Sequence, residues 1–150
     1  MTAGSLSHTP AQVIAQLLVD LACGSSASLT VGWPVFSTNE PDLPDNVITV
    51  YDTEGNQDGR FMITGEVRQH YGLQFRIRGT SHSIAHAKAN TLKQILDQTV
   101  LRTAVALGGS TYLVQSVSRR SGPISIGKES PTSRRVIFTL NAVVSLRQVS

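Results

Sequence analysis

The sequence is poor in several features on which other classes of protein depend. Its 150 residues include one cysteine, which excludes an intramolecular disulfide framework and a zinc site built from paired cysteines. Aromatic residues make up 5% of the chain, so we expect a mainly aliphatic core and no row of stacking platforms for single-stranded nucleic acid. No apolar run reaches the roughly 18 residues of a membrane span, and we expect no membrane among the partners. The length predicts a single domain, 1–150.

Lys and Arg are absent before Arg60, although that part of the chain holds seven of the 10 acidic residues. All 13 basic residues stand from Arg60 onward, together with three acidic ones. A chain divided in this way suits head-to-tail self-association or contact with a charged partner. The alternative stays open that the two parts interleave in one sheet, in which case the asymmetry averages out.

Two helices are predicted. The first covers about 9–22, with Thr9 as its N-cap and Pro10 at the first helical position. The second runs from about Ser83 to Thr99. Its expected apolar stripe consists of Ile84, Ala87, Leu92, Ile95 and Leu96.

Alternation of apolar and polar residues predicts the strands. The clearest strand runs from Arg135 to Arg147 and places Phe138 and Leu140 on one apolar face. Further elements are expected at 33–36 (a short edge element), 47–52, 73–78 and 112–118, with a turn at 54–59 that connects to 60–62. The order of these elements predicts an α+β fold with a mainly antiparallel β-sheet, two helices packed on one face, and a long β-hairpin arm whose loop is about 119–135.

The motifs that resemble chemical sites each lack something that the chemistry requires. The run 122–128 has the spacing of a phosphate-binding P-loop, but Glu129 replaces the hydroxyl that would bind magnesium, and Pro131 interrupts the helix that must follow. His82 and His86 are spaced to share a helix face, without a third metal ligand at a suitable distance along the chain. No nucleophile stands in an activating motif. We therefore expect no enzyme, no cofactor and no metal site.

The segment 119–135 is the one most suited to binding, because five cations accompany a single acid there. Its length and charge predict an arm that contacts a partner. The partner is either the phosphate backbone of a nucleic acid or an acidic surface on a neighbouring subunit. The residues expected at the interface are Arg119, Arg120, Lys128, Arg134 and Arg135 on the arm, Arg76 and Arg78 on a strand, and Asp52, Glu54 and Asp58 on the acidic turn.

The stretch VITVYDTEGNQDGRFMITGEVRQHYGLQFRIRGT resembles the small tail terminator proteins of long-tailed bacteriophages, which are often described as minor capsid proteins. The likeness continues through AHAKANTLKQIL, YLVQSVSRRSGPISIGKE and RRVIFTLNAVV, and it covers most of the chain from Trp33 to Leu146. It implies a non-enzymatic structural protein of the virion that assembles in the host cytoplasm. Such proteins form a hexameric ring that caps the head-proximal end of the tail tube, ends tube polymerisation and provides the surface for head-tail joining.

The partners that this resemblance implies are other copies of the chain, the tail tube protein and a head completion or connector protein. Genomic DNA would pass through the ring without specific binding. In that arrangement we expect Arg76 and Arg78 to face a protein neighbour rather than the DNA. The alternatives are another neck or head-completion connector protein, or a nucleic-acid-binding module that uses the basic 119–135 loop.

Overall fold

The computed structural model describes residues 7–21, 33–37, 39–40, 45–60, 67–98, 101–120, 122–128, 130–132 and 134–148. Within these ranges the chain forms two helices and one seven-stranded sheet, which confirms the predicted α+β fold. The elements are α1 (Pro10–Asp20), β1 (Val35–Ser37), β2 (Val47–Arg60), β3 (Val67–Gly79), α2 (His82–Gln98), β4 (Leu101–Leu107), β5 (Ser110–Arg119), β6 (Ile124–Lys128) and β7 (Val136–Gln148).

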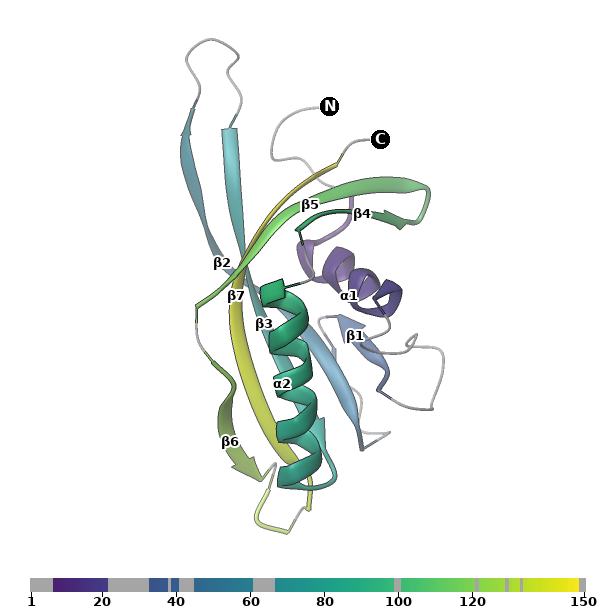
Figure 1. The fold of residues 1–150 in the computed structure, drawn as a ribbon, viewed down its shortest axis with the longest axis vertical. Helices are drawn as coiled ribbons and strands as arrows, with labels where there is room; N and C mark the ends of the chain where they lie inside the picture. Colours follow the sequence, from purple (N-terminus) through teal and green to yellow (C-terminus); the bar gives the residue numbers. More distant parts are fainter. Residues whose placement is uncertain are drawn as a thin grey trace.

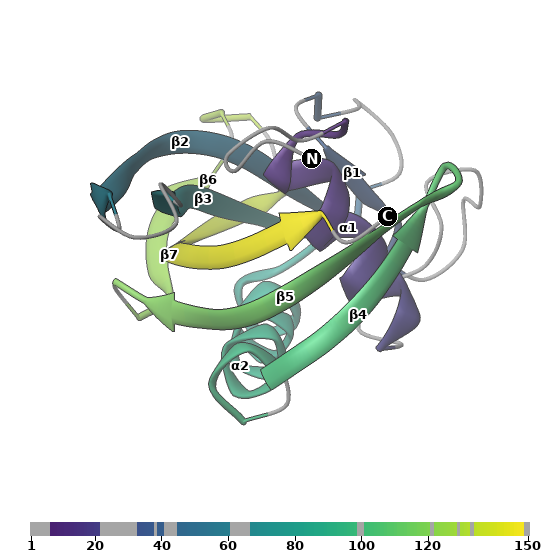
Figure 2. The same cartoon turned by 90° about the horizontal axis from the view of Figure 1, so that it is seen from above.

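The sheet has the strand order β1-β2-β3-β7-β5-β4, and β6 pairs with β7. The pairing of β1 with β2 is parallel, and the other ladders are antiparallel as predicted. The sheet is strongly curved, and α1 lies between its β1 end and its β4 end (Figure 2). The second helix, α2, runs along β7 and β3 (Figure 1).

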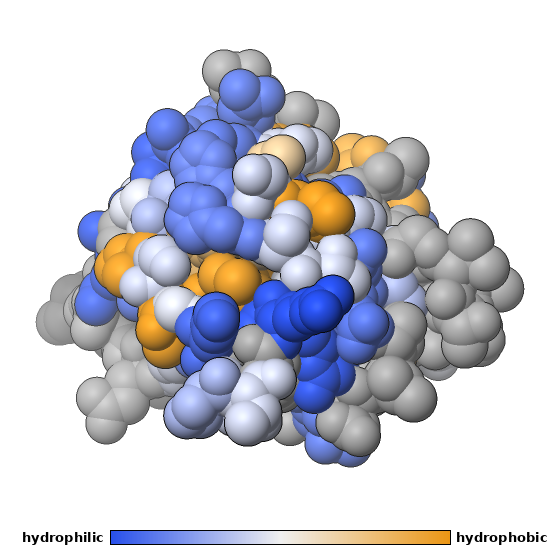
Figure 3. Space-filling view, turned by 90° about the horizontal axis from the view of Figure 1, so that it is seen from below, coloured by the Kyte–Doolittle hydropathy of each residue, from blue (hydrophilic) through white to orange (hydrophobic). Residues whose placement is uncertain are grey.

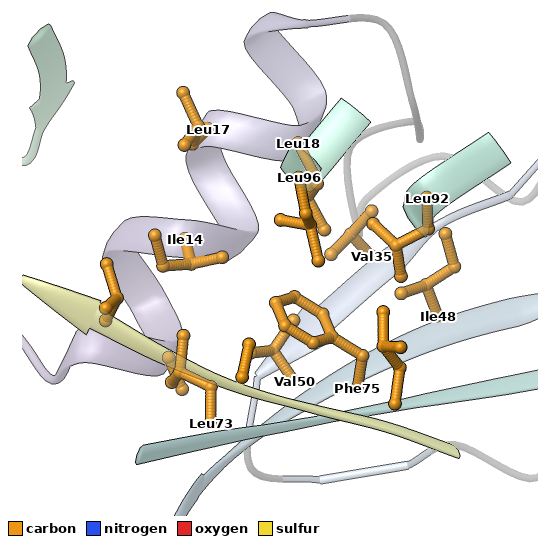
Figure 4. Close-up of a cluster of buried hydrophobic side chains, with 14 of the residues drawn as sticks. Ile14, Leu17, Leu18, Val35, Ile48, Val50, Leu73, Phe75, Leu92 and Leu96 are labelled. Atoms are coloured by element: carbon orange, nitrogen blue, oxygen red, sulfur yellow. The ribbon is translucent and has the colours of Figure 1, made fainter. Parts of the chain in front are cut away.

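One apolar core fills the space between the two helices and the sheet (Figure 4). Leu73, Phe75 and Ile77 project from β3 into this core, as the alternation predicts. Phe138 and Leu140 on β7 stand opposite Ile77 and Phe75 and are also buried. The predicted register of the last strand is therefore confirmed.

The first helix is fixed at its N-terminus by a capping box. The Thr9 hydroxyl accepts a hydrogen bond from the Gln12 backbone, and the Gln12 side chain accepts one from the Thr9 backbone N–H. The Asp52 carboxylate on β2 accepts a third, from the Ala11 N–H at 2.9 Å. A carboxylate at this end of a helix satisfies a free backbone donor and complements the helix dipole. The helix ends at Asp20, two residues earlier than predicted.

The apolar stripe of α2 differs from the predicted one. The core-facing residues are Ala85, Ala89, Leu92 and Leu96, whereas Ile84 is 43% exposed. A Cβ on Gly79 would lie 3.0 Å from the Cβ of Ala85, so the helix starts in close contact with the end of β3. The small alanines allow that approach, and the stripe is rotated toward them.

The expected turn at 54–59 is wrong, because β2 continues through this segment to Arg60. The β2–β3 register shifts between Thr53 and Asn56 and again between Gln57 and Arg60. Such irregularities accommodate extra residues in a two-stranded ladder without ending it. Of the segment 60–62 expected after that turn, Arg60 is the last residue of β2, and 61–62 lie outside the described residues.

The predicted arm loop also differs from expectation, because its middle forms β6 along β7. The hairpin that extends farthest from the rest of the sheet is formed by β2 and β3 (Figure 1). The β3–β7 ladder ends at Tyr71, whereas the β2–β3 ladder continues to Arg60 and Val67. The acidic segment of β2 thus belongs to a two-stranded extension.

Candidate interaction surfaces

Arg78 is buried on the sheet face opposite the helices and is 1% exposed. Its Nε donates a hydrogen bond to the Asp45 carbonyl oxygen at 3.2 Å, and its Nη1 lies 3.8 Å from Glu40 Oε1. A buried charge needs such compensation, because its transfer from water is costly. We exclude Arg78 from the proposed interface, because it is buried and its charge is paired with Glu40 of the same chain.

Arg76 shares the same internal partner. Its Nε lies 3.1 Å from Glu40 Oε2, in an ion pair whose direction does not suit a hydrogen bond. Burial, followed by the charge of Glu40, raises the pKa of the neighbouring Tyr51 phenol, while Arg76 and Arg78 oppose that rise. Glu40 therefore interacts with both arginines and with the tyrosine on this face of the sheet.

Among the described residues, acidic partners are seen for two of the five cations predicted on the arm. Arg119 Nε donates to Asp97 Oδ1 on α2 at 2.7 Å, and this hydrogen bond raises the pKa of Arg119. Arg135 Nη1 lies 3.6 Å from Asp45 Oδ1. These contacts hold the two ends of the segment against the body of the protein.

The other three cations, Arg120, Lys128 and Arg134, are exposed and flank β6. The strand between them exposes two large apolar side chains, Ile124 at 50% and Ile126 at 59%. Figure 3 views the end of the molecule where β6 terminates, and apolar side chains lie there among strongly hydrophilic ones. We call Ile124, Ile126, Arg120, Lys128 and Arg134 the β6 surface.

The predicted acidic residues are distributed along β2. Asp52 is exposed and caps α1, so its carboxylate already has a structural role. Glu54 and Asp58 follow on the stretch of β2 for which β3 is the sole partner among the described strands. The structure therefore separates the acidic segment from the β6 surface along the length of the sheet.

Sequence reasoning missed Glu40 as a partner of arginine, and it missed Ile124 and Ile126. The isoleucines could have been recognised from the alternation Ile124-Ser125-Ile126, which is bounded by Pro123 and Gly127. No local signal links Glu40 to Arg76 and Arg78, because the contact depends on the tertiary fold.

The described residues contain no group of three or more His, Cys, Asp or Glu that could hold a metal ion. The rings of His82 and His86 stack at a centroid distance of 6.1 Å, and each meets the Phe138 ring at an angle. A shallow hollow of about 380 Å³ beside α1 is lined by one titratable side chain, His8. The His8 Nδ1 is hydrogen-bonded to the Tyr112 hydroxyl at 2.6 Å. Among the described helices, none is long and apolar enough to cross a membrane.

A curved sheet with two helices on one face, a strand that exposes isoleucines and a two-stranded acidic extension define a small α+β protein. The sequence profile of the bacteriophage tail terminator proteins matches residues 15–142, and the chain belongs to that family. It is therefore a structural protein of the phage virion, with a role in completing the tail.

Solved structures show the same fold. A chain from the virion of a native gene transfer agent particle superposes with a TM-score of 0.53 at 10% identity, over 93% of this chain and 98% of that chain. A second solved structure, known by a sequence identifier alone, superposes with a TM-score of 0.50 at 13% identity, over 93% and 94% of the two chains. No curated protein sequence matches this chain.

Proposed function

We propose that this protein forms a homo-hexameric ring on the head-proximal end of the tail tube, ends tube polymerisation and presents the surface to which the head attaches. Its partners are other copies of the chain, the tail tube protein and a head completion or connector protein. The ring assembles in the host cytoplasm without enzymatic activity or a cofactor. Genomic DNA passes through it without specific binding.

The observation that carries this proposal is a pair of chemically different segments, β6 and the acidic stretch of β2, at separate edges of the sheet of a tail terminator family member. The β6 surface is basic and apolar, whereas the β2–β3 extension carries acidic residues. Contacts between two different patches are heterologous, and they close into a ring when the rotation between neighbours permits it. The internal ion pairs of Arg76, Arg78, Arg119 and Arg135 leave fewer cations for a nucleic-acid site, so we favour protein partners.

The test combines light scattering of the purified protein with electron microscopy of tail tubes mixed with it. We expect a species of six copies, in solution or at one end of each tube, and tubes that no longer elongate when free tube protein is added. A monomer in solution that never caps a tube would contradict the proposal. Binding to the head connector in the absence of tubes would instead favour a neck protein.

DNA binding provides a separate control. We expect weak association with duplex DNA at physiological salt. A nucleic-acid-binding module would bind measurably, and its affinity would fall with salt at a log–log slope of about −0.9 for each phosphate neutralised.

A further inference from the structure

Within the described part of the chain, the strand β6 is paired along one edge only. It pairs with β7 at Val136–Thr139, and among the described strands it has no second neighbour. The strands β5 and β6 follow the same edge of β7 in succession, but β4 covers β5 only as far as Ser116. Among the described strands, none therefore pairs with the outer edge of β6 or with the end of β5 beyond Ser116.

The side chains of β6 suit burial better than exposure. Ile124 and Ile126 are half exposed or more, and the strand has no charge before Lys128. Proteins usually blunt a free edge with charges, prolines or bulges, because its unpaired backbone groups accept strands from other chains. A bulge between Ser125 and Gly127 is present, yet both isoleucines stay accessible.

The distal part of β2 offers a complementary edge. β1 pairs with β2 only at Ile48–Val50, so beyond Val50 the side of β2 away from β3 has no strand partner among the described residues. The segment 52–60 contains three acidic residues and one arginine. The cations of the β6 surface, Arg120, Lys128 and Arg134, provide the opposite charge.

We propose that the free edge of β6 pairs with the distal edge of β2 (52–60) in a second copy of this chain, which continues the sheet from one subunit into the next. Backbone hydrogen bonds and burial of Ile124 and Ile126 stabilise the contact, and the opposite charges fix which edges meet. The proposal deepens the ring proposed above and rests on it for the number of copies, while the pairing itself can be tested without tubes.

Cross-linking tests the pairing directly. In a Cys23→Ser background, the chain carries Ser125→Cys on β6 and Gln57→Cys on β2, and a short bis-maleimide joins the thiols. Ser125 lies level with Phe138, Ile77 and Ile48 across the sheet, so Gln57 is nine residues farther along β2, or roughly 30 Å within one subunit. The cross-link can therefore form only between subunits.

We expect covalent multimers from the Ser125→Cys/Gln57→Cys protein, in solution or bound to tubes. A matched control replaces the second cysteine with Ala104→Cys, which is exposed on the other edge strand, β4, and should give no multimers. Absence of multimers in both settings, equal multimers from the control, or cross-linking of Ser125→Cys to the tube protein would overturn the pairing. If a hexamer forms but this cross-link does not, the β6–β2 pairing is refuted and the proposed ring is not. If the cross-linked copies form open chains, the ring is refuted and the pairing is not.

The isoleucines supply a second, non-covalent measurement. Ile124→Thr with Ile126→Thr keeps strand propensity but removes apolar area, and we expect self-association to weaken by roughly 20-fold. Ile84→Thr is the control, because Ile84 is exposed on the flank of α2 opposite His82 and His86 and should change the affinity by less than about 2-fold. Unchanged association of the double variant, or an equal loss in the control, would contradict a role of β6.

Discussion

The paired strands β6 and β7 lie side by side in opposite environments. The β7 residues that pair with β6, Val136–Thr139, are all buried, whereas Ile124, Ser125 and Ile126 of β6 are exposed. The alternation of β6 is nevertheless that of a half-buried strand. A strand with the alternation of a half-buried element can therefore lie exposed at the edge of the described sheet, beside a stretch of β7 that is buried.

The cations can likewise be divided into those that are paired within the chain and those that are exposed. Arg78 and Arg135 lie beside acidic partners within the chain, whereas Lys128 and Arg134 stand exposed at the ends of β6 and β7. Part of the basic charge of the second half of the chain is therefore paired with acidic residues of the first half. Of the five cations predicted on the arm, the three that are exposed, Arg120, Lys128 and Arg134, lie close to β6 in the sequence.

The largest effect is expected on the buried side of the β6–β7 pair. Phe138 is 3% exposed and contacts the rings of His82 and His86. Phe138→Ala should lower the free energy of unfolding by about 3–5 kcal/mol, because it leaves a cavity in the core. The residue opposite it supplies the control: Ser125→Ala should change the unfolding free energy by less than about 0.5 kcal/mol in chemical denaturation. Equal effects would show that β6 and β7 do not differ in burial.

The next largest effect compares two cations. Arg78→Ala removes one partner from a buried ion pair and should cost about 3 kcal/mol of unfolding free energy. Lys128→Ala removes an exposed charge and should cost less than about 0.5 kcal/mol. Thermal and denaturant unfolding of both variants checks the contrast. A mild Arg78→Ala variant would mean that the Glu40 network contributes little.

How far the sequence predicts this molecule depends on whether the evidence is local. The register of β7 and the cap of α1 follow from alternation and from Thr9, Pro10 and Gln12, all within a few residues of one another. The rotation of the α2 stripe could not be foreseen, because it depends on how closely Ala85 approaches Gly79. Residue propensities alone also predicted an end of β2 at residue 52, which is too early. The polar, glycine-containing stretch that follows stays in the strand because it pairs with β3.

The candidate site shows the same limit. Composition and charge directed attention to 119–135, and three of its five predicted cations are exposed around β6. Which cations are internally paired depends on Glu40, Asp45 and Asp97, which come from other parts of the chain. A sequence pattern locates charge, but only the fold shows which charges are already neutralised.

A smaller effect is expected at Asp52, which belongs to the acidic segment but is tied to α1. Asp52→Ala should lower the free energy of unfolding by about 1 kcal/mol, because the Ala11 N–H at the helix N-terminus loses its acceptor. Glu54→Ala should be close to neutral if it serves only an interface. Denaturant titration of the two variants checks the difference, and an unchanged Asp52→Ala protein would contradict the capping role. Asp52 is consequently a poor choice for charge reversal.

The smallest effect on stability should accompany the largest effect on assembly. Lys128→Glu with Arg134→Glu reverses two exposed charges of the β6 surface, and the free energy of unfolding should stay within about 0.5 kcal/mol of the parent value. Arg135 is spared, because a carboxylate there would face Asp45. Assembly should fail, since like charges then meet at every subunit junction, and electron microscopy should show overlong tubes or tails without heads.

The control is Lys88→Glu with Lys93→Glu on α2, which makes the same change in net charge and should leave tube capping intact. This control also removes the contact of Lys88 with the Trp33 ring. Adding Glu54→Lys with Asp58→Lys to the β6 variant should restore part of the capping, because it returns opposite charges to the two edges. Normal tails from the β6 variant, or a failure of the α2 control as well, would remove the β6 surface from the assembly interface.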